Sequence, residues 1–149
     1  MTPITQRYID EAGLAARVDV MTADAVQGPL SGAFDVAVLF RLLQVLSPDQ
    51  APRVLRNVGQ IVEPGGVIYI VGQILDNSRL SPPETVVGNL LFLNVFDEGQ
   101  AYTEQEHRDW LADAGFEECA RCILPNKMSV MRARKLREGM TGAHRLSDC

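Results

Sequence analysis

The chain has 149 residues, 46% of them hydrophobic and 22% charged, so it is long enough for one domain with a hydrophobic core. Its net charge of -5 argues against a nucleic-acid partner, and no apolar run approaches the ~20 residues that a membrane-spanning helix needs, so we expect no membrane partner. An odd number of cysteines, three, and the lack of a basic-then-apolar leader predict a cytoplasmic protein without a disulfide framework.

The first part of the chain predicts one helix and one strand. Thr and Pro at the start open a helix over residues 2–12, which Gly13 ends. Residues 17–21 alternate as a short strand. Asp24 and Ala25 follow at the carboxyl end of that strand, where ligand-binding side chains are common.

The middle of the chain predicts a strand, a helix and a second strand. Residues 34–40 are a nearly continuous apolar run, which is typical of a strand buried on both faces of a parallel sheet. Ser47 and Gln50 have the spacing of a capping box. The helix that follows ends at residues 63–66, Glu-Pro-Gly-Gly, before a buried strand at 67–71. A unit of this length implies a right-handed crossover between parallel strands.

Two further helices follow. One begins at residues 81–84 and is apolar nearly all round from 89 to 96, so we expect it to be buried or to face a ligand or partner. The other begins at a capping box formed by Thr103 and Glu106 and ends at Gly115.

The chain then predicts a returning pair of strands at 116–124 and 128–133, followed by a frayed tail from 135 to 149. Cys119 and Cys122 have C-x-x-C spacing, but a zinc site needs a second pair of ligands, so we predict no metal site.

Four motifs stand in a fixed order along these elements. They are Phe34-Asp35-Val36-Ala37-Val38-Leu39, Leu42-Leu43-Gln44-Val45-Leu46-Ser47-Pro48-Asp49-Gln50, Glu63-Pro64-Gly65-Gly66, and Tyr102-Thr103-Glu104 with Leu111 and Ala114-Gly115-Phe116. The set resembles the C-terminal part of class I S-adenosylmethionine-dependent methyltransferases, and more narrowly the O-methyltransferases of small aromatic or polyketide hydroxyl groups. The resemblance implies an α/β fold: a partial Rossmann-like sheet, mostly parallel with a C-terminal antiparallel strand pair. It implies a partial catalytic domain over residues 1–134.

The resemblance implies S-adenosylmethionine as the methyl donor, with Asp24, Ala25 and Phe40 on the donor side. The glycine-rich loop and the acidic ribose contact of the family lie before the matched part, so we expect this chain alone not to hold the donor. Two alternatives stay open from the residues themselves: Asp24 as a loop cap and Phe40 as a core residue.

The position of the family's catalytic histidine is occupied by Gln44, and that of its supporting glutamate by Ala101. An amide cannot act as a general base, although it can orient a substrate hydroxyl or carbonyl group. A buried structural amide is the alternative for Gln44. By resemblance, Leu91, Asn94 and Val95 lie on the substrate-lining helix, with Asn94 orienting the acceptor; a helix packed against a partner is the alternative.

Two functions follow. In the first, the chain is the C-terminal part of a methyltransferase that acts on a small-molecule acceptor, by O-methylation. In the second, it is a non-catalytic binding or assembly module derived from that fold. A dinucleotide-dependent oxidoreductase is a more distant alternative, because its glycine fingerprint is absent.

The family places two strands between residues 17–21 and residues 34–40, and neither lies in this chain. Three outcomes are open for the edge that this leaves: direct pairing of 17–21 with 34–40, pairing with a second copy as a homodimer, or a missing N-terminal segment of a longer protein. We expect direct pairing in an isolated fold and the longer protein in biology.

Overall fold

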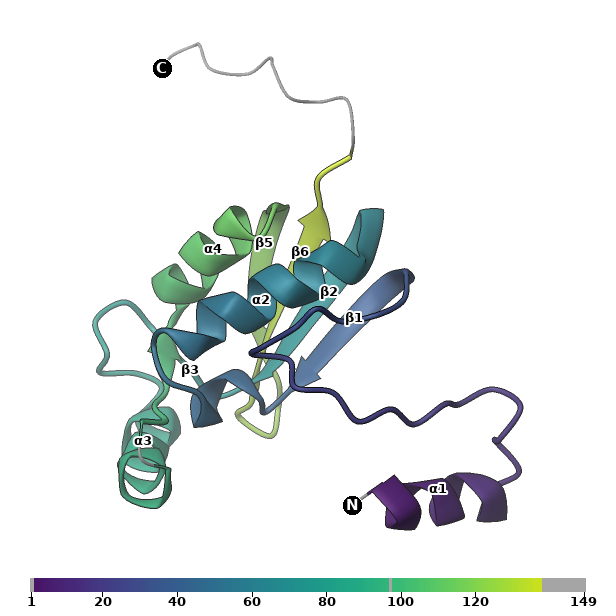
Figure 1. The fold of residues 1–149 in the computed structure, drawn as a ribbon. Coiled ribbons are helices and arrows are strands. Elements are labelled where there is room, and N and C mark those ends of the chain that lie inside the picture. Colours follow the sequence, from purple (N-terminus) through teal and green to yellow (C-terminus); the bar gives the residue numbers. More distant parts are fainter. Residues whose placement is uncertain (1, 97, 138–149) are drawn as a thin grey trace.

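The computed structural model describes residues 2–96 and 98–137, and its elements follow the predicted order closely (Figure 1). They are α1 (Thr2–Glu11), β1 (Phe34–Phe40), the 3-10 helix η1 (Leu43–Val45), α2 (Gln50–Ile61), β2 (Val62–Gly72), β3 (Ile74–Leu75), α3 (Pro83–Val95), β4 (Tyr102–Thr103), α4 (Glu104–Asp113), β5 (Phe116–Ile123) and β6 (Ser129–Lys135).

The main sheet has the strand order β1-β2-β6-β5. β1 runs parallel to β2, with Val38 opposite Tyr69, and α2 forms the crossover between them. β6 then pairs antiparallel with both β2 and β5. The predicted α/β fold is therefore confirmed, including the antiparallel strand pair at its C-terminal end. A second, two-stranded sheet pairs β3 with β4 in parallel.

One face of the sheet carries the core. Figure 1 shows α2 and α4 lying over the same face, in front of the strands. Leu55 from α2 and Leu111 from α4 are fully buried there, against Ile68 of β2 and Met131 of β6. The apolar stripe predicted along α2 is the origin of this packing, because its buried residues recur at helical spacing.

The opposite face is open at β1. Val36, Val38 and Phe40 alternate along the strand and are 52%, 59% and 60% exposed. The expectation that residues 34–40 are buried on both faces is therefore wrong for the described chain. The reason is that the apolar run supplies two packing faces, whereas α2 and α4 cover only one of them.

Residues 17–21 form no strand, so the direct pairing expected for an isolated fold is also wrong. Within the described residues β1 pairs only with β2, and its other edge has no ladder partner. Instead, the turn after Asp24 is held against α2, where Asn57 Nδ2 donates to the carbonyl oxygens of Ala25 and Val26.

The hydrogen bonds of both predicted capping boxes are present, but α2 begins at Gln50, and its N-cap residue, Asp49, makes no side-chain capping bond. Ser47 and Gln50 exchange hydrogen bonds between side chain and backbone at 3.1 and 3.2 Å, and Thr103 and Glu106 form the second capping box. Gly115 has a φ of +82°, which ends α4 in the left-handed region. Lys135, where the tail was predicted to start, is the last residue of β6, and residues 138–149 lie outside the described part.

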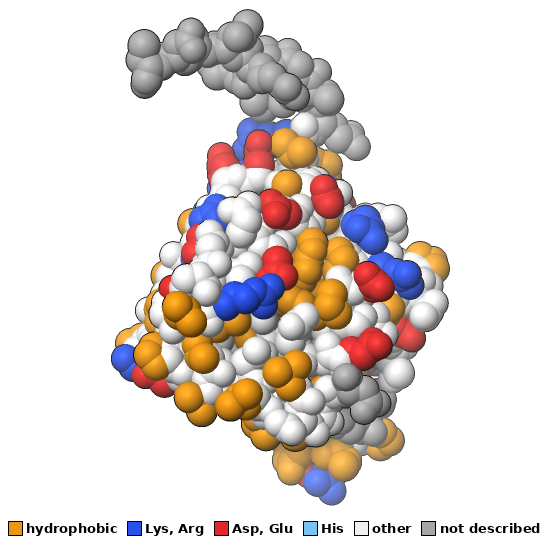
Figure 2. Space-filling model, turned by 90° about the vertical axis from the view of Figure 1, so that its left-hand side faces the viewer, with side chains coloured by type: hydrophobic (Ala, Val, Ile, Leu, Met, Phe, Trp, Pro, Cys, Tyr) orange, Lys and Arg blue, Asp and Glu red, His pale blue; other side chains and the backbone are white. Residues whose placement is uncertain are grey.

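The helix α3 is more exposed than predicted. Only Thr85 and Phe92 are buried in it, so the first expected alternative, a buried helix, is wrong for the described chain, and a helix that faces a ligand or partner stays a prediction. Figure 2 shows hydrophobic side chains over the lower part of the face where α3 lies. The exposed apolar side chains of this helix are Val87, Leu90, Leu91, Leu93 and Val95. No helix among the described residues is long and apolar enough to cross a membrane.

Tyr102 ties β4 to the segment before α2. Its side chain is 1% exposed, and its hydroxyl donates to the carbonyl oxygen of Leu46 over 2.6 Å. Burial raises the pKa of Tyr102 to about 12, so the hydroxyl stays a donor at ordinary pH. The edges of its ring neighbours, Trp110 and His107, pack against it.

Replacing Tyr102 by Phe should lower the free energy of unfolding by about 1–2 kcal/mol, because the partly buried Leu46 carbonyl loses its donor while the ring packing stays. Urea denaturation measures the change. Tyr8→Phe, at a position that is 60% exposed, is the matched control and should change stability by less than about 0.5 kcal/mol. Equal effects of the two substitutions would contradict the assigned role of the hydroxyl.

Candidate functional site

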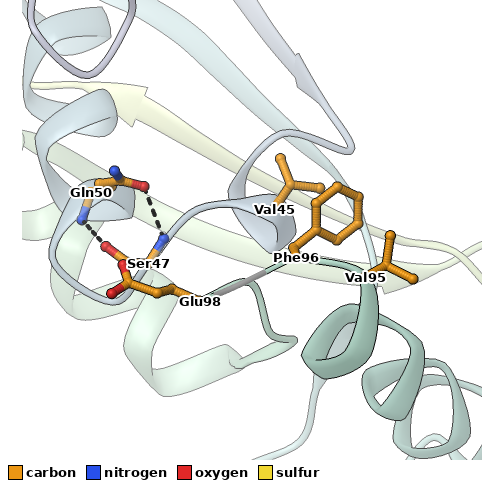
Figure 3. Close-up of a pocket in the computed structure, with 6 residues that line it drawn as sticks. All are labelled: Val45, Ser47, Gln50, Val95, Phe96 and Glu98. Carbon is orange, nitrogen blue, oxygen red and sulfur yellow. Dashed lines mark hydrogen bonds between the residues drawn. The ribbon is translucent and has the colours of Figure 1, made fainter.

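A groove lies between the chain that follows β1 and the C-terminal end of α3. It has a volume of about 470 Å³ and is lined by Val45, Ser47, Gln50, Val95, Phe96 and Glu98 (Figure 3). An adjoining hollow of about 480 Å³ shares Ser47 and Glu98 with it. In open α/β sheets, ligands bind outside the carboxyl ends of parallel strands, and the chain that leaves β1 forms one wall here.

A close backbone contact holds the two walls together. A Cβ atom at Gly99 would lie 2.9 Å from the carbonyl oxygen of Gln44 and 3.2 Å from the Cα atom of Val45. The turn after α3 therefore packs on η1 through a residue that has no side chain. Because backbone atoms cannot move aside as a flexible side chain does, this contact sets the separation of the walls.

The groove has an apolar end and a polar end. Figure 3 shows Val45, Val95 and Phe96 grouped at one end, and Glu98 directed toward Ser47 and Gln50 at the other. Ser47 and Gln50 use their side chains in the capping box. Within the described residues the Glu98 carboxylate forms no ion pair, so it is the charge that the groove offers to a ligand.

Gln44 does not line this groove. It is 6% exposed, and its amide oxygen accepts a hydrogen bond from the backbone N–H of Gln73 over 3.1 Å. Together with Tyr102 and His107, its side chain borders a cavity of about 10 Å³. This cavity is no larger than the space that one water molecule needs. This bond agrees with the alternative of a structural amide, and substrate contact by Gln44 stays a prediction.

Of the three predicted substrate residues, the structure brings only Val95 into the groove. Leu91 and Asn94 are exposed on α3. The Asn94 amide donates to the carbonyl oxygen of Leu90 over 2.5 Å, which turns it toward its own helix. Orientation of an acceptor by Asn94 therefore stays a prediction that requires a different rotamer.

The three predicted donor-side residues lie around β1. One carboxylate oxygen of Asp24 accepts hydrogen bonds from the N–H groups of Val26 and Gln27 at 2.9 and 3.2 Å. Asp24 therefore caps a turn, which is the alternative that the sequence left open for it. Ala25 packs partly against the core, and its carbonyl accepts from Asn57. Phe40 is 60% exposed, so it is not a core residue of the described chain.

These residues fit only one edge of a donor site. Asp24 has a second carboxylate oxygen, and Phe40 presents an uncovered ring. A bound S-adenosylmethionine also needs a run of backbone N–H groups in a glycine-rich loop, and the sequence before β1 contains none. The fit is therefore partial, as the sequence predicted.

Sequence reasoning missed most of the lining. Phe96 and Glu98 lie in no motif, and Val45 lies in the motif at residues 42–50 without a predicted site role. The three residues meet only through the packing of the turn on η1. It also missed Gln73, whose side-chain oxygen is buried without a hydrogen-bond partner in the described structure. This oxygen lies beside Gly88 of α3, and that glycine within an apolar helix was the available signal.

His107 is a core residue, as its helical position predicted. Its side chain is 2% exposed, and Nδ1 lies 2.7 Å from the carbonyl oxygen of Thr103. Because a carbonyl can only accept, we assign the proton to Nδ1. Burial lowers the pKa of His107; the bond to Thr103 and the charges of Glu106 and Glu104 oppose this, whereas that of Arg121 adds to it.

Neither cysteine of the C-x-x-C pair is in a disulfide; Cys119 is half-buried and Cys122 is exposed. Burial raises the pKa of the Cys119 thiol, which disfavours a reactive thiolate. In residues 2–96 and 98–137, no group of three or more His, Cys, Asp or Glu side chains could hold a metal ion.

Comparison with known proteins identifies the family. A family model described as an O-methyltransferase domain matches residues 3–117. The chain is 29% identical over 116 residues to the tetracenomycin polyketide synthesis 8-O-methyl transferase TcmO of Streptomyces glaucescens, covering 78% of this chain and 34% of that protein. The chain belongs to the O-methyltransferase family, and it spans about a third of the length of this relative.

Solved structures agree with this assignment. The S-adenosylmethionine-dependent methyltransferase SibL, in its apo form, is similar with a TM-score of 0.81 and 25% identity, over 91% of this chain and 41% of that chain. Human N-acetylserotonin methyltransferase, in complex with S-adenosylmethionine, gives a TM-score of 0.72 and 27% identity, over 81% of this chain and 34% of that chain.

Replacing Gly99 by Ala should lower the free energy of unfolding by about 1–3 kcal/mol, because the new methyl group meets backbone atoms of η1. Gly88→Ala is the matched control: its methyl group meets the Gln73 side chain, which can move, and alanine favours a helix. Urea denaturation of both variants tests this, and a Gly99→Ala variant as stable as Gly88→Ala would contradict the contact.

Acid should destabilise the fold through His107. Because its pKa is lower in the folded state, the unfolded chain binds more protons as the pH falls below about 6.5, where a free imidazole titrates. This contribution is present in full above that pH and decreases below it, by up to about 1.4 kcal/mol per pH unit. His107→Asn keeps an N–H donor but does not titrate.

Urea denaturation between pH 7.5 and pH 5 measures the effect. The Asn variant should show a shallower loss of stability with acid than the parent chain, beyond a constant offset from the smaller side chain. The same pH dependence in both proteins would show that His107 does not titrate in this range.

Proposed function

We propose that this chain is the acceptor-binding, C-terminal part of an S-adenosylmethionine-dependent methyltransferase that methylates a hydroxyl group of a small molecule. The match to the O-methyltransferase domain over residues 3–117 carries the proposal. The groove between η1 and α3 supports it, because it lies where this fold binds ligands. The donor, when bound, supplies the methyl group to the acceptor oxygen in one displacement.

The residues of this chain contribute position and shape. Val45, Val95 and Phe96 exclude water and hold the apolar body of the acceptor, and Glu98 accepts a hydrogen bond from its polar end. Gln44 holds Gln73 and takes no proton, so the acceptor hydroxyl must ionise without a base at that position. The rate then depends mainly on how the acceptor is oriented toward the donor.

A donor-binding segment would complete the sheet at β1. The free edge of β1 offers a row of N–H and C=O groups, and Val36, Val38 and Phe40 offer an apolar face beside it. Burial of each of these side chains would contribute about 1.5–3 kcal/mol. A strand of a second copy could pair with this edge of β1. A donor-binding segment that brings a strand and a helix would cover both the edge and the apolar face, so we favour the segment over a homodimer. A cytoplasmic location is proposed as well, because the three cysteines of this chain are an odd number and do not indicate a disulfide framework.

A non-catalytic module is the second candidate, and two observations favour it. Gln44 uses its acceptor oxygen within the fold, and Ala101, at the position of the supporting glutamate, is 0% exposed. In this case the same groove binds a small molecule without methylating it. Only a reaction measurement separates the two candidates.

Joining the chain to a donor-binding segment should restore donor binding. The experiment supplies the segment of TcmO that precedes the matched region, as a separate polypeptide and as a fusion, and measures binding of S-adenosylmethionine by calorimetry. We expect no binding tighter than millimolar for the chain alone and micromolar binding for the assembly. Methyl transfer to a small phenol is then assayed on the assembly.

Val38→Glu should abolish the assembly, because it places a charge on the face to be covered, while the chain alone keeps its fold. Leu80→Glu, at a position that is 77% exposed and outside that face, is the matched control and should leave assembly unchanged. Micromolar donor binding by the chain alone would contradict the proposed division of the site. Donor binding without transfer would favour the non-catalytic candidate.

A further inference from the structure

The charge of the groove identifies the chemistry of its ligand. Among the described residues that line the groove and its adjoining hollow, two are carboxylates, Asp49 and Glu98, and none is a lysine or arginine. Asp49 precedes the first turn of α2, where the partial positive charge of the helix N-terminus stabilises a carboxylate. Glu98 has no such partner.

The opposite end of the groove is a wall of apolar side chains. Phe96 presents an aromatic ring that is 36% exposed, between Val45 and Val95 (Figure 3). A planar apolar ring fits against such a wall, since aromatic pairs gain about 0.5–1.5 kcal/mol beyond their buried area. The two hollows, about 470 and 480 Å³, are each within the range of small-molecule sites.

We propose that the acceptor is a ring-bearing amine, with its ring against Phe96 and its ammonium group on the Glu98 carboxylate. An ammonium carries a positive charge and only hydrogen-bond donors, and the Glu98 carboxylate at the polar end is a negatively charged acceptor. The side-chain oxygens of Ser47 and Gln50 accept hydrogen bonds from backbone N–H groups in the capping box, and the Ser47 hydroxyl and the Gln50 amide N–H groups stay donors that suit a hydroxyl oxygen of the ligand. A carboxylate-bearing acceptor would be repelled by Glu98, and a neutral one would gain only the apolar contact.

This inference rests on the proposed function, but its test needs neither donor nor methyl transfer. Three phenols of similar size are titrated into the chain: tyramine (cationic), 4-propylphenol (neutral) and 3-(4-hydroxyphenyl)propanoate (anionic). Methyl NMR signals of Val45 and Val95 report where each binds. We expect tyramine to bind about three- to fivefold more tightly than 4-propylphenol, the range of an exposed ion pair, and the propanoate most weakly. The preference should decrease with salt.

Glu98→Gln should make the affinities of tyramine and 4-propylphenol equal, and Asp49→Asn should have a smaller effect. Glu84→Gln, at the other end of α3, is the matched control and should keep the preference. Equal affinities in the parent chain, tightest binding of the propanoate, absence of saturable tyramine binding, or signal changes away from Val45 and Val95 would each overturn the inference. A failure of methyl transfer in the assembled protein would leave a measured preference standing.

Discussion

The fold depends on the parallel pairing of β1 with β2 through the crossover helix α2. This pairing brings Leu39 of β1 and Ile70 of β2 side by side, and α2 covers them with Val54 and Leu55. A parallel pair cannot be closed by a tight turn, so the crossover helix must pack on the sheet for the strands to meet. The carboxyl ends of both strands are then fixed. The segment after β1 lines the groove, and the segment after β2 binds the Gln44 side chain through the N–H group of Gln73.

Arg121 connects the far edge of the sheet to the same region. Its guanidinium, 9% exposed as a side chain, donates to the carbonyl of Ile74 over 2.6 Å and lies 3.3 Å from the Glu104 carboxylate. It also donates to the hydroxyl of Ser129 at 3.0 Å. One charged side chain on β5 therefore holds β3, β6 and the start of α4. Removing such a buried donor would leave several acceptors unpaired. The hairpin formed by β5 and β6 therefore supports β3 and the start of α4, which lie beside the site.

The sequence predicts elements wherever a local physical rule is sufficient. The reciprocal bonds of Ser47 with Gln50, the capping box at Thr103, the stripe on α2 and the returning hairpin depend on neighbours within a few residues, and all are present. The strand expected at residues 17–21 is absent, because a strand needs a ladder partner that local pattern does not supply. The groove lining was not predictable for a related reason: Val45, Phe96 and Glu98 meet only where Gly99 presses on η1.

By resemblance, Gln44 and Ala101 stand at the positions of the family's catalytic histidine and its supporting glutamate, and both are buried in the described structure. Ala101 is fully buried, and its N–H donates to the side-chain oxygen of Asn89 over 2.6 Å, which anchors α3 to the chain before β4. The amide oxygen of Gln44 lies 2.7 Å from where a Cβ at Gly72 would stand, so the end of β2 packs tightly around it. Gln44 and Ala101 therefore both serve the packing of the fold: one holds the chain after β2 through Gln73, and the other holds α3 through Asn89.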